Sequence, residues 1–459
     1  MVLKCVDKPL IVSRYSYFFK TSKGDFLAYS SKSNSFLEIS EVLYDLLKFT
    51  STCDKKELPI DKIPQDIIDI LINEGFVCTK YDDDDYVSKN QFITQSIQYN
   101  KSRLGLVIAP TLNCNFDCPY CFESNKTFKY INDATIDNII DFIKKHSSAE
   151  LLKLTWYGGE PLLALNKIEN ILENITEKIG IEINDHTLIT NGYLFDENAV
   201  RLFKKYPLKS IQITLDGVKC RHDELRALKN SQSKGTYDKI LKNIKLISDE
   251  LPNTELHIRV NIDKNNKDDY FKVYEELKDT IGLKNKIVYP GIIRIENKEK
   301  TELVYPAFAR DETSNYLFDI MKMGYINGQV FPTRMVSKTC TANCVNSYII
   351  GPSGEIYKCW NDVSDPNKIV GYITEDKITN TSLYYRYHQG CSWYNDSECK
   401  TCFYMPICNG KCIWYNERNI YHSGTYNLCQ CLQKSPGLLD QTLEYYYEHN
   451  ILSFENNKI

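Results

Sequence analysis

No stretch of this sequence is apolar for long enough to cross a membrane, and its start does not resemble a signal peptide. A membrane span needs about 20 apolar residues, and no run approaches that length. The first residues, Met1 to Cys5, lack the basic, apolar and cleavage segments of a secretory signal. We therefore expect a cytoplasmic protein with no membrane partner. Because thiols stay reduced in the cytoplasm, the 17 cysteines indicate metal binding rather than disulfides.

A strong net charge is missing as well. The formal net charge over 459 residues is −4, with 42% hydrophobic and 25% charged residues. This balance does not supply the broad basic field that attracts nucleic acids, so we expect no nucleic-acid partner. The length and composition are typical of a globular protein of roughly two to four domains.

The first hundred residues carry no catalytic motif. Two apolar segments, 10–18 and 25–30, flank a Lys-Gly hairpin signal, and two amphipathic helices follow, the first with Ser40 as its N-cap. With a short strand at 75–77, these elements predict a winged-helix-like module over residues 1–85. Four consecutive aspartates at 82–85 then predict a solvated linker, expected to run over 86–102, because runs of like charge are usually disordered.

Between residues 103 and 300, apolar runs alternate with helical periods, which favours βα units and a parallel sheet. Six strands are expected, at 104–109, 151–155, 186–190, 211–215, 255–262 and 287–295. Helices are expected between them, at 134–145, 168–178, 198–205, 237–248 and 269–277. Six βα units predict a partial (β/α)6 TIM-like barrel, in which the functional residues lie at the carboxyl ends of the strands.

Three cysteines with C-x₃-C-x₂-C spacing, Cys114, Cys118 and Cys121, come directly after the first of these strands. Cysteine thiolates are the usual ligands of iron–sulfur clusters, so this loop can hold three irons of a four-iron cluster. The fourth iron then stays open for chemistry. Taken alone, the triplet also suits a zinc knuckle.

The triplet resembles the signature of the radical SAM superfamily, whose cysteine loop follows the first strand of a partial barrel and has an aromatic residue, here Tyr120, before its last cysteine. Residues 156–161 (WYGGEP) look like the glycine-glycine-glutamate motif of that family. The resemblance implies that Gly158, Gly159 and Glu160 bind the amino group of S-adenosylmethionine. Two glycines allow the backbone to approach a ligand closely, and a carboxylate suits an ammonium group.

Other candidate cofactor contacts lie at strand ends. Thr190 and Asn191 close the third expected strand, where family members contact the cofactor ribose, and Arg259 lies at the fifth strand. Further polar residues at such ends are Thr214, Asp216, Asn261 and Asp263. Each of these residues, taken singly, is usual in turns and caps. Their shared position favours a role at the cofactor.

A second cysteine pattern begins at Cys344 and reads C-x₉-G-x₄-C, followed after a gap by C-x₂-C-x₅-C-x₃-C-x₁₆-C. It is similar to the seven-cysteine pattern of SPASM domains, with a pair of zinc ribbons as the alternative. The resemblance implies two auxiliary 4Fe–4S clusters with crossed ligation. One set would be Cys340, Cys344, Cys359 and Cys412, and the other Cys399, Cys402, Cys408 and Cys429. Cys391 and Cys431 are spare and suit either set.

These resemblances together imply a radical SAM peptide maturase with S-adenosylmethionine and three 4Fe–4S clusters, one that binds the cofactor and two auxiliary. Such an enzyme generates a 5′-deoxyadenosyl radical and forms a thioether or carbon–carbon crosslink in a ribosomally made precursor peptide. The module at 1–85 loosely resembles leader-peptide-recognition domains, which bind an extended peptide at a sheet edge. We also expect an external one-electron reductant such as flavodoxin or ferredoxin.

The expected domains are the module at 1–85, the linker at 86–102, the barrel at 103–300, a bridging region at 301–337, the SPASM domain at 338–435 and a C-terminal helix at 436–459.

Two alternatives remain open at this point. An anaerobic sulfatase-maturase shares the SPASM domain, but by family resemblance it has an aspartate directly after the second cluster cysteine, where this chain has Trp360. A non-enzymatic multi-cluster electron carrier or a zinc-stabilised binding module needs no cofactor pocket, and the glycine-glycine-glutamate motif speaks against it.

Overall fold

The structure is a computed structural model that describes residues 9–52, 57–121, 128–229, 235–293, 306–326, 339–375, 377–429, 435 and 437–452. Its centre is a nine-stranded sheet in the order β11-β10-β9-β8-β7-β6-β12-β13-β14. The first six in this order are mutually parallel. Their bounds are β6 Arg103–Ile108, β7 Leu151–Trp156, β8 Glu182–Thr190, β9 Ser210–Leu215, β10 Glu255–Ile262 and β11 Lys286–Ile292. The predicted six-stranded parallel sheet is confirmed.

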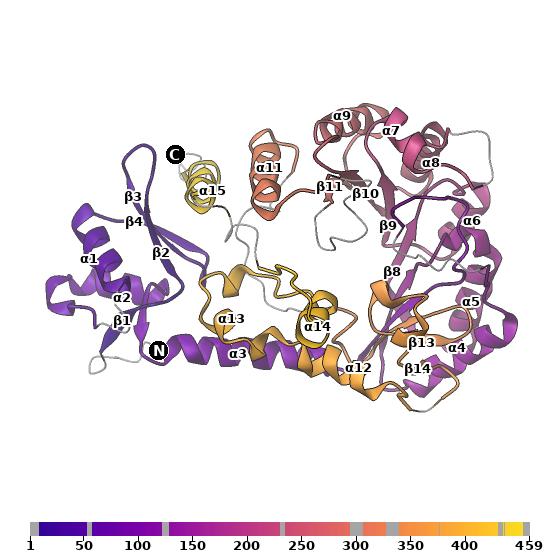
Figure 1. Ribbon diagram of the computed structural model, residues 1–459, viewed down its shortest axis with the longest axis horizontal. Helices are drawn as coiled ribbons and strands as arrows, with labels where there is room; N and C mark the ends of the chain where they lie inside the picture. The colour runs from indigo at the N-terminus through magenta and orange to yellow at the C-terminus, as the bar shows by residue number, and fades with distance from the viewer. Residues whose placement is uncertain are drawn as a thin grey trace.

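Helices follow these strands in the predicted places and cover the outer face of the sheet (Figure 1). They are α4 Asp133–Lys145, α5 Leu165–Lys178, α6 Glu197–Lys205, α8 Tyr237–Glu250 and α9 Asp269–Ile281. The short helix α7, Lys219–Leu225, was not predicted. Each long helix buries one apolar stripe against the sheet, as α4 does with Ile136, Ile139 and Ile143. Within the described residues, no helix has both the length and the apolar character that crossing a bilayer requires.

The cysteine-rich region continues the same sheet. β12 (Ser347–Ile350) pairs in parallel with β6, and β13 (Glu355–Tyr357) and β14 (Gly371–Tyr372) extend the edge in antiparallel fashion. Short helices complete the region: α12 Thr381–Tyr385, α13 Ser397–Thr401 and α14 Ile413–Tyr421. Because β6 leads into the cysteine triplet, its pairing with β12 fixes the cysteine-rich region beside the predicted active site.

The N-terminal module has two small sheets and two helices. β1 (Leu10–Val12) pairs with β5 (Val77–Thr79), while β2 (Ser16–Lys20), β3 (Phe26–Ser30) and β4 (Ser35–Glu38) form a separate antiparallel sheet. The helices are α1 Glu41–Ser51 and α2 Gln65–Asn73. Ser40 caps α1 as predicted, since its hydroxyl accepts the Leu43 N–H at 3.3 Å. The hairpin of β2 and β3 was predicted, but the segment 10–18, expected as one strand, is divided between β1 and β2, which lie in separate sheets. The edge strand β4 was not predicted.

The predicted solvated linker is wrong, because its residues form the helix α3, Asp82–Gln98. Four aspartates in the first turn suit the positive end of the helix dipole. One of them, Asp83, is buried and accepts hydrogen bonds from the Ser13 hydroxyl at 2.9 Å and from Lys32 at 3.2 Å. The helix runs from the N-terminal module toward the parallel sheet, alongside the cysteine-rich segments (Figure 1).

The N-terminal module packs on the C-terminal part of the chain. Phe19, Leu27 and Tyr29 share a buried cluster with Leu439 and with other residues of α15 (Leu438–Tyr446), the predicted closing helix. The Ser31 hydroxyl also donates to the Phe403 carbonyl at 2.7 Å. The module is therefore integrated into the molecule. Of the expected bridging region, residues 306–326 are described and carry α11 (Arg310–Lys322), while Cys431 and residues 294–295 lie outside the described residues.

Candidate active site and cysteine clusters

The cysteine triplet lies at the carboxyl end of β6, as predicted. Cys114 is buried, and its sulfur accepts the Phe116 N–H at 3.4 Å, while Cys118 and Cys121 are partly exposed. The Cys121 N–H donates to the Cys118 carbonyl at 3.2 Å, which turns the loop tightly. Three thiols lie on one loop, and two of them are accessible. This arrangement suits an iron–sulfur cluster that also contacts a bound cofactor.

The glycines of the glycine-glycine-glutamate motif pack against the cysteine loop. A Cβ on Gly158, whose φ is +115°, would lie 2.4 Å from the Thr111 carbonyl oxygen, and one on Gly159 would lie 2.2 Å from that of Asn113. The Gly159 N–H donates to Thr111 at 3.1 Å and the Glu160 N–H to Asn113 at 2.8 Å. Glycine is needed here because two backbones touch, a reason additional to the expected approach of a ligand.

Glu160 is fully buried and holds the ends of two strands together. Its carboxylate accepts the Thr190 hydroxyl at 2.7 Å, the Asn191 N–H at 2.8 Å and the Leu162 N–H at 3.0 Å. Burial raises the pKa of Glu160, although these donors favour its ionised form. A carboxylate offers about four acceptor positions, so one position stays available for a further donor.

Asn191 connects this carboxylate to the cysteine loop. Its side-chain amide donates to Asn115 Oδ1 at 2.8 Å and approaches Cys114 Sγ at 3.9 Å. The predicted residues from the ends of β7 and β8 therefore converge on the first cysteine of the triplet. Asn115 was not predicted, and only its place inside the triplet hinted at a role.

A buried arginine braces the far side of the cysteine loop. Arg226 donates to the Tyr120 hydroxyl at 2.9 Å and lies 3.5 Å from Asp216, and its guanidinium lies 5.5 Å from the Phe116 ring centroid. The Tyr120 hydroxyl in turn donates to Asp216. Burial raises the pKa of Tyr120, so its hydroxyl stays protonated. Sequence reasoning missed Arg226, because it follows a short helix that carries no motif.

The same aspartate links the loop to the fifth barrel strand. Asn261 donates to Asp216 at 2.7 Å and accepts from Arg259 Nε at 2.9 Å. Gly291 on β11 makes room for this arginine, since a Cβ there would lie 2.4 Å from Arg259 Nε. Arg259, the predicted cofactor contact on β10, is thus brought into the network around the cysteine loop.

One predicted set of auxiliary cysteines lines a common cavity. Cys399, Cys402, Cys408 and Cys429 all face it, beside Trp393 and Met405. Burial raises the pKa of Cys399 to about 12, so metal binding must displace protons from neutral thiols. Across the described residues, no three His, Cys, Asp or Glu side chains converge on a single ion position.

The other predicted set also gathers. Cys340 interacts electrostatically with Cys344 and Cys412, and Cys359 interacts with Cys340 and Cys412. Burial raises the pKa of Cys359 well above its usual value. Cys391, predicted as a spare, is fully buried near Glu417 and does not line the cavity of Cys399, Cys402, Cys408 and Cys429.

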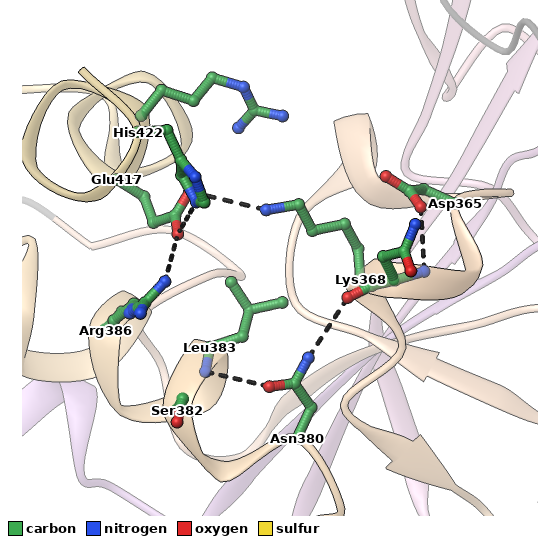
Figure 2. A pocket seen from close by; sticks show the side chains of 10 residues that line it. Asp365, Lys368, Asn380, Ser382, Leu383, Arg386, Glu417 and His422 are labelled. Atoms are coloured by element: carbon green, nitrogen blue, oxygen red, sulfur yellow. Dashed lines mark hydrogen bonds and ion pairs between the residues drawn. The ribbon is translucent and has the colours of Figure 1, made fainter. Parts of the chain in front are cut away.

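A buried ion-pair network holds Cys412 in position. Helix α14 begins directly after Cys412 and carries Glu417, which is fully buried at the wall of a cavity of about 460 Å³. Figure 2 shows Glu417 between Arg386, His422 and Lys368. The Oε1 atom of Glu417 lies 3.2 Å from Arg386 Nη1 and 3.0 Å from His422 Nε2, and its Oε2 atom lies 3.6 Å from Lys368 Nζ. These contacts tie α14 to the segments before and after α12.

Asp362 makes a second link, between α14 and Cys359. It accepts the Trp414 indole N–H at 2.9 Å and the Tyr387 hydroxyl at 2.8 Å. Burial raises its pKa to about 6. The two networks explain how thiols far apart in sequence, on Cys359 and Cys412, are held near each other.

Comparison with known proteins agrees with this geometry. Residues 108–277 match the Radical SAM superfamily. The cysteine-type anaerobic sulfatase-maturating enzyme of Clostridium novyi (strain NT) is 25% identical over 76% of this chain and 95% of its own length. The radical SAM cyclopropyl synthase TigE of Paramaledivibacter caminithermalis is 21% identical over 89% of this chain and 90% of its own. The solved structure of native anSMEcpe with bound AdoMet and Cp18Cys peptide shares the fold, with a TM-score of 0.58, 20% identity and coverage of 78% of this chain and 100% of that one.

A parallel partial barrel with a cysteine triplet behind its first strand defines a class of α/β enzymes that hold an iron–sulfur cluster at the carboxyl ends of the strands. Residues 108–277 form a radical SAM domain, and the chain as a whole resembles maturases of that superfamily. A radical SAM domain implies S-adenosylmethionine and a 4Fe–4S cluster as cofactors. The resemblance to radical SAM enzymes that was inferred from the motifs is confirmed.

Proposed function

We propose that this radical SAM enzyme is a peptide maturase that forms a thioether or carbon–carbon crosslink in a ribosomally made precursor. The observation that carries the proposal is an apolar groove beside an open sheet edge in the N-terminal module. Two relatives support it: one similar sequence is a cyclopropyl synthase, and one similar fold was solved with a bound peptide.

In this proposal, Cys114, Cys118 and Cys121 hold the cofactor-binding 4Fe–4S cluster. The residues proposed to contact S-adenosylmethionine are Gly158, Gly159, Glu160, Thr190, Asn191 and Arg259. When bound, the cluster and S-adenosylmethionine would supply a 5′-deoxyadenosyl radical that abstracts a hydrogen atom from the substrate. The chain orients the cofactor through the remaining acceptor position of Glu160, which suits the cofactor ammonium.

Replacing Glu160 by glutamine is expected to weaken S-adenosylmethionine binding about ten- to a hundredfold, because a charge-assisted hydrogen bond is worth roughly 1.5–3 kcal/mol. Equilibrium dialysis of anaerobically reconstituted protein measures the change in affinity. Replacing the exposed Glu169, on α5, by glutamine is the matched control and is expected to have no effect. Equal affinity in the two variants would show that residues 158–160 form a structural turn and do not bind the cofactor.

The two gathered cysteine sets are proposed to hold the two auxiliary 4Fe–4S clusters. Crossed ligation suits this region, because each cluster would close long loops that short helices alone do not stabilise. An external one-electron reductant, such as flavodoxin or ferredoxin, would supply electrons. The auxiliary clusters would take back the electron that crosslink formation releases.

The groove in the N-terminal module is proposed to bind the leader part of the precursor. It has a volume of about 430 Å³ and is lined by β4, α1 and α2, with apolar side chains such as Leu37, Leu43 and Ile67. Among the described strands, β4 pairs only with β3, so its other edge is open to a further strand. An extended peptide can pair with that edge while its alternate side chains enter the groove.

Replacing Val42 by glutamate is expected to weaken leader binding at least about tenfold, because burying one apolar side chain contributes roughly 1.5–3 kcal/mol. Val42 lines the groove and is 80% exposed, so the substitution leaves the fold intact. Phe49 lies on the same helix, is 60% exposed and does not line the groove, so Phe49→Glu is the matched control. Fluorescence anisotropy with a labelled precursor peptide, taken from the open reading frames beside the gene, measures both.

A point variant is a sharper test than deletion of residues 1–85. The module buries Phe19, Leu27 and Tyr29 against α15, so its removal would strip the core of the C-terminal region. A proline placed in the paired stretch of the leader should also abolish binding, since it removes a ladder hydrogen bond. Equal binding by the Val42 and Phe49 variants would contradict the leader site.

The similarity to a sulfatase-maturating enzyme makes that activity the second candidate. The position directly after Cys359 distinguishes the two. It is Trp360, whose ring lies 4.7 Å from that of Tyr157, the residue before the glycine pair. The nearby Asp362 is fully buried and accepts hydrogen bonds from Trp414 and Tyr387. Mass spectrometry of a sulfatase-type cysteine peptide after turnover tests the alternative, and formylglycine there would favour it.

A further inference from the structure

Lys358 is a lysine without a carboxylate partner, and burial lowers the pKa of its ammonium to about 7, a shift that negative charge on Cys344 and Cys340 opposes. Its side chain has no exposed surface, and its ammonium donates to the Cys344 carbonyl at 2.7 Å and to the Ser347 carbonyl. It lies 5.0 Å from the Tyr348 ring centroid and 5.6 Å from that of Tyr384. Within the described part of the chain, no aspartate or glutamate forms an ion pair with it. A buried charge is costly unless an opposite charge lies close to it.

The groups that it faces are cysteine thiols, which become negatively charged thiolates when they bind a metal. Lys358 immediately precedes Cys359 and interacts electrostatically with Cys344 and Cys340. On the other side of the set, Asp362 faces Cys359 but is already engaged by Tyr387 and Trp414. His388, the other titratable group beside Lys358, is kept neutral by burial, which lowers its pKa to about 4. Iron-bound thiolates would therefore supply the negative charge that the structure otherwise lacks.

We propose that Lys358 is the buried counter-cation of the auxiliary cluster at Cys340, Cys344, Cys359 and Cys412, and that it makes this cluster easier to reduce. The inference rests on the proposed function, since it requires that cluster. Net charge and hydrogen bonding around a cluster set its reduction potential. A one-electron reduction adds a negative charge to the cluster while Lys358 keeps its proton, so the ammonium stabilises the reduced form more than the oxidised form.

The test is a redox titration of anaerobically reconstituted full-length enzyme, followed by electron paramagnetic resonance. In Lys358→Met, the ratio of the reduced to the oxidised form of one cluster should fall about tenfold at a fixed potential. This corresponds to a reduction potential lower by about 59 mV for one electron, while the other clusters keep their potentials. Lys358→Gln removes the charge but still donates to the two carbonyls, and should give the same shift. The exposed Lys377 provides the matched control, Lys377→Met, with no expected shift.

The outcomes separate the inference from the function on which it rests. If the unsubstituted enzyme holds only one cluster by iron content, the proposal of auxiliary clusters fails. If the cluster forms in the Lys358 variants with an unchanged potential, the counter-cation proposal is overturned. It is likewise overturned if both variants lose the cluster, because Lys358 would then be a structural tie between Cys344 and Ser347.

Discussion

Replacing Cys114, Cys118 and Cys121 together by alanine is expected to abolish 5′-deoxyadenosine release while about two-thirds of the iron stays bound, because the two proposed auxiliary clusters would use separate ligands. The structure supports this separation. The triplet lies behind β6 and is braced by Asn191 and Arg226, whereas the other thiols gather in the region that follows β12. Iron and sulfide analysis after anaerobic reconstitution, together with chromatography of the nucleoside product, measures both effects.

The matched control for this variant is Cys220→Ala. Cys220 is exposed on α7 and belongs to none of the three cysteine groups, so iron content and product release should stay at their original values. Loss of all iron from the triple variant would show that the clusters depend on one another. Zinc in place of iron in protein isolated without oxygen would contradict the iron–sulfur assignment of the whole chain.

The barrel could be predicted because its signals are local. Each strand is a short apolar run followed by an amphipathic helix, and the six predicted strands lie within a few residues of β6 to β11. The failures concern partners far away in sequence. Asp83 belongs to a helix because Ser13 and Lys32 satisfy its charge from positions 70 and 51 residues away, and no local pattern reveals that.

The pairing of β12 with β6 is a failure of the same kind. Ser347 pairs with Gly105, although the two residues are more than two hundred positions apart in the sequence. A Cβ on Gly105 would lie 2.7 Å from Ser347 Oγ. Glycine at 105 therefore reflects a close strand contact that appears only when both strands are placed. This contact carries the cysteine-rich region to the edge of the barrel, beside the triplet.

The members of the candidate site could be predicted better than their contacts. Motif spacing selected Gly158, Gly159, Glu160, Thr190 and Asn191, and the structure brings them together. Their packing could not be read from the motif, because the glycines touch a neighbouring loop and the glutamate binds two strand ends. Arg226 and Lys358 have no motif, and their roles depend on burial, which only the folded chain defines.

Replacing Arg226 by methionine is expected to lower the free energy of local opening of the cysteine loop by about 3–5 kcal/mol, because removing one partner of a buried ion pair leaves the other charge uncompensated. The Asp216 side chain is 1% exposed and would lose its only ion-pair partner among the described residues, and Tyr120 would lose a hydrogen-bond donor. Native-state hydrogen exchange reports such local opening. The amides of Asp117 and Lys229, which bind the carbonyls of Ala227 and Asn115, should exchange at least about a hundredfold faster.

A double variant distinguishes loss of the ion pair from loss of packing. In Arg226→Met with Asp216→Asn, no uncompensated charge remains, so part of the protection should return, with a coupling of about 0.5–3 kcal/mol. The exposed Arg201 on α6, replaced by methionine, is the control and should leave these amides unchanged. If the double variant exchanges as fast as Arg226→Met alone, the arginine braces the loop by its bulk and its contact with Phe116, and charge compensation of Asp216 plays no part.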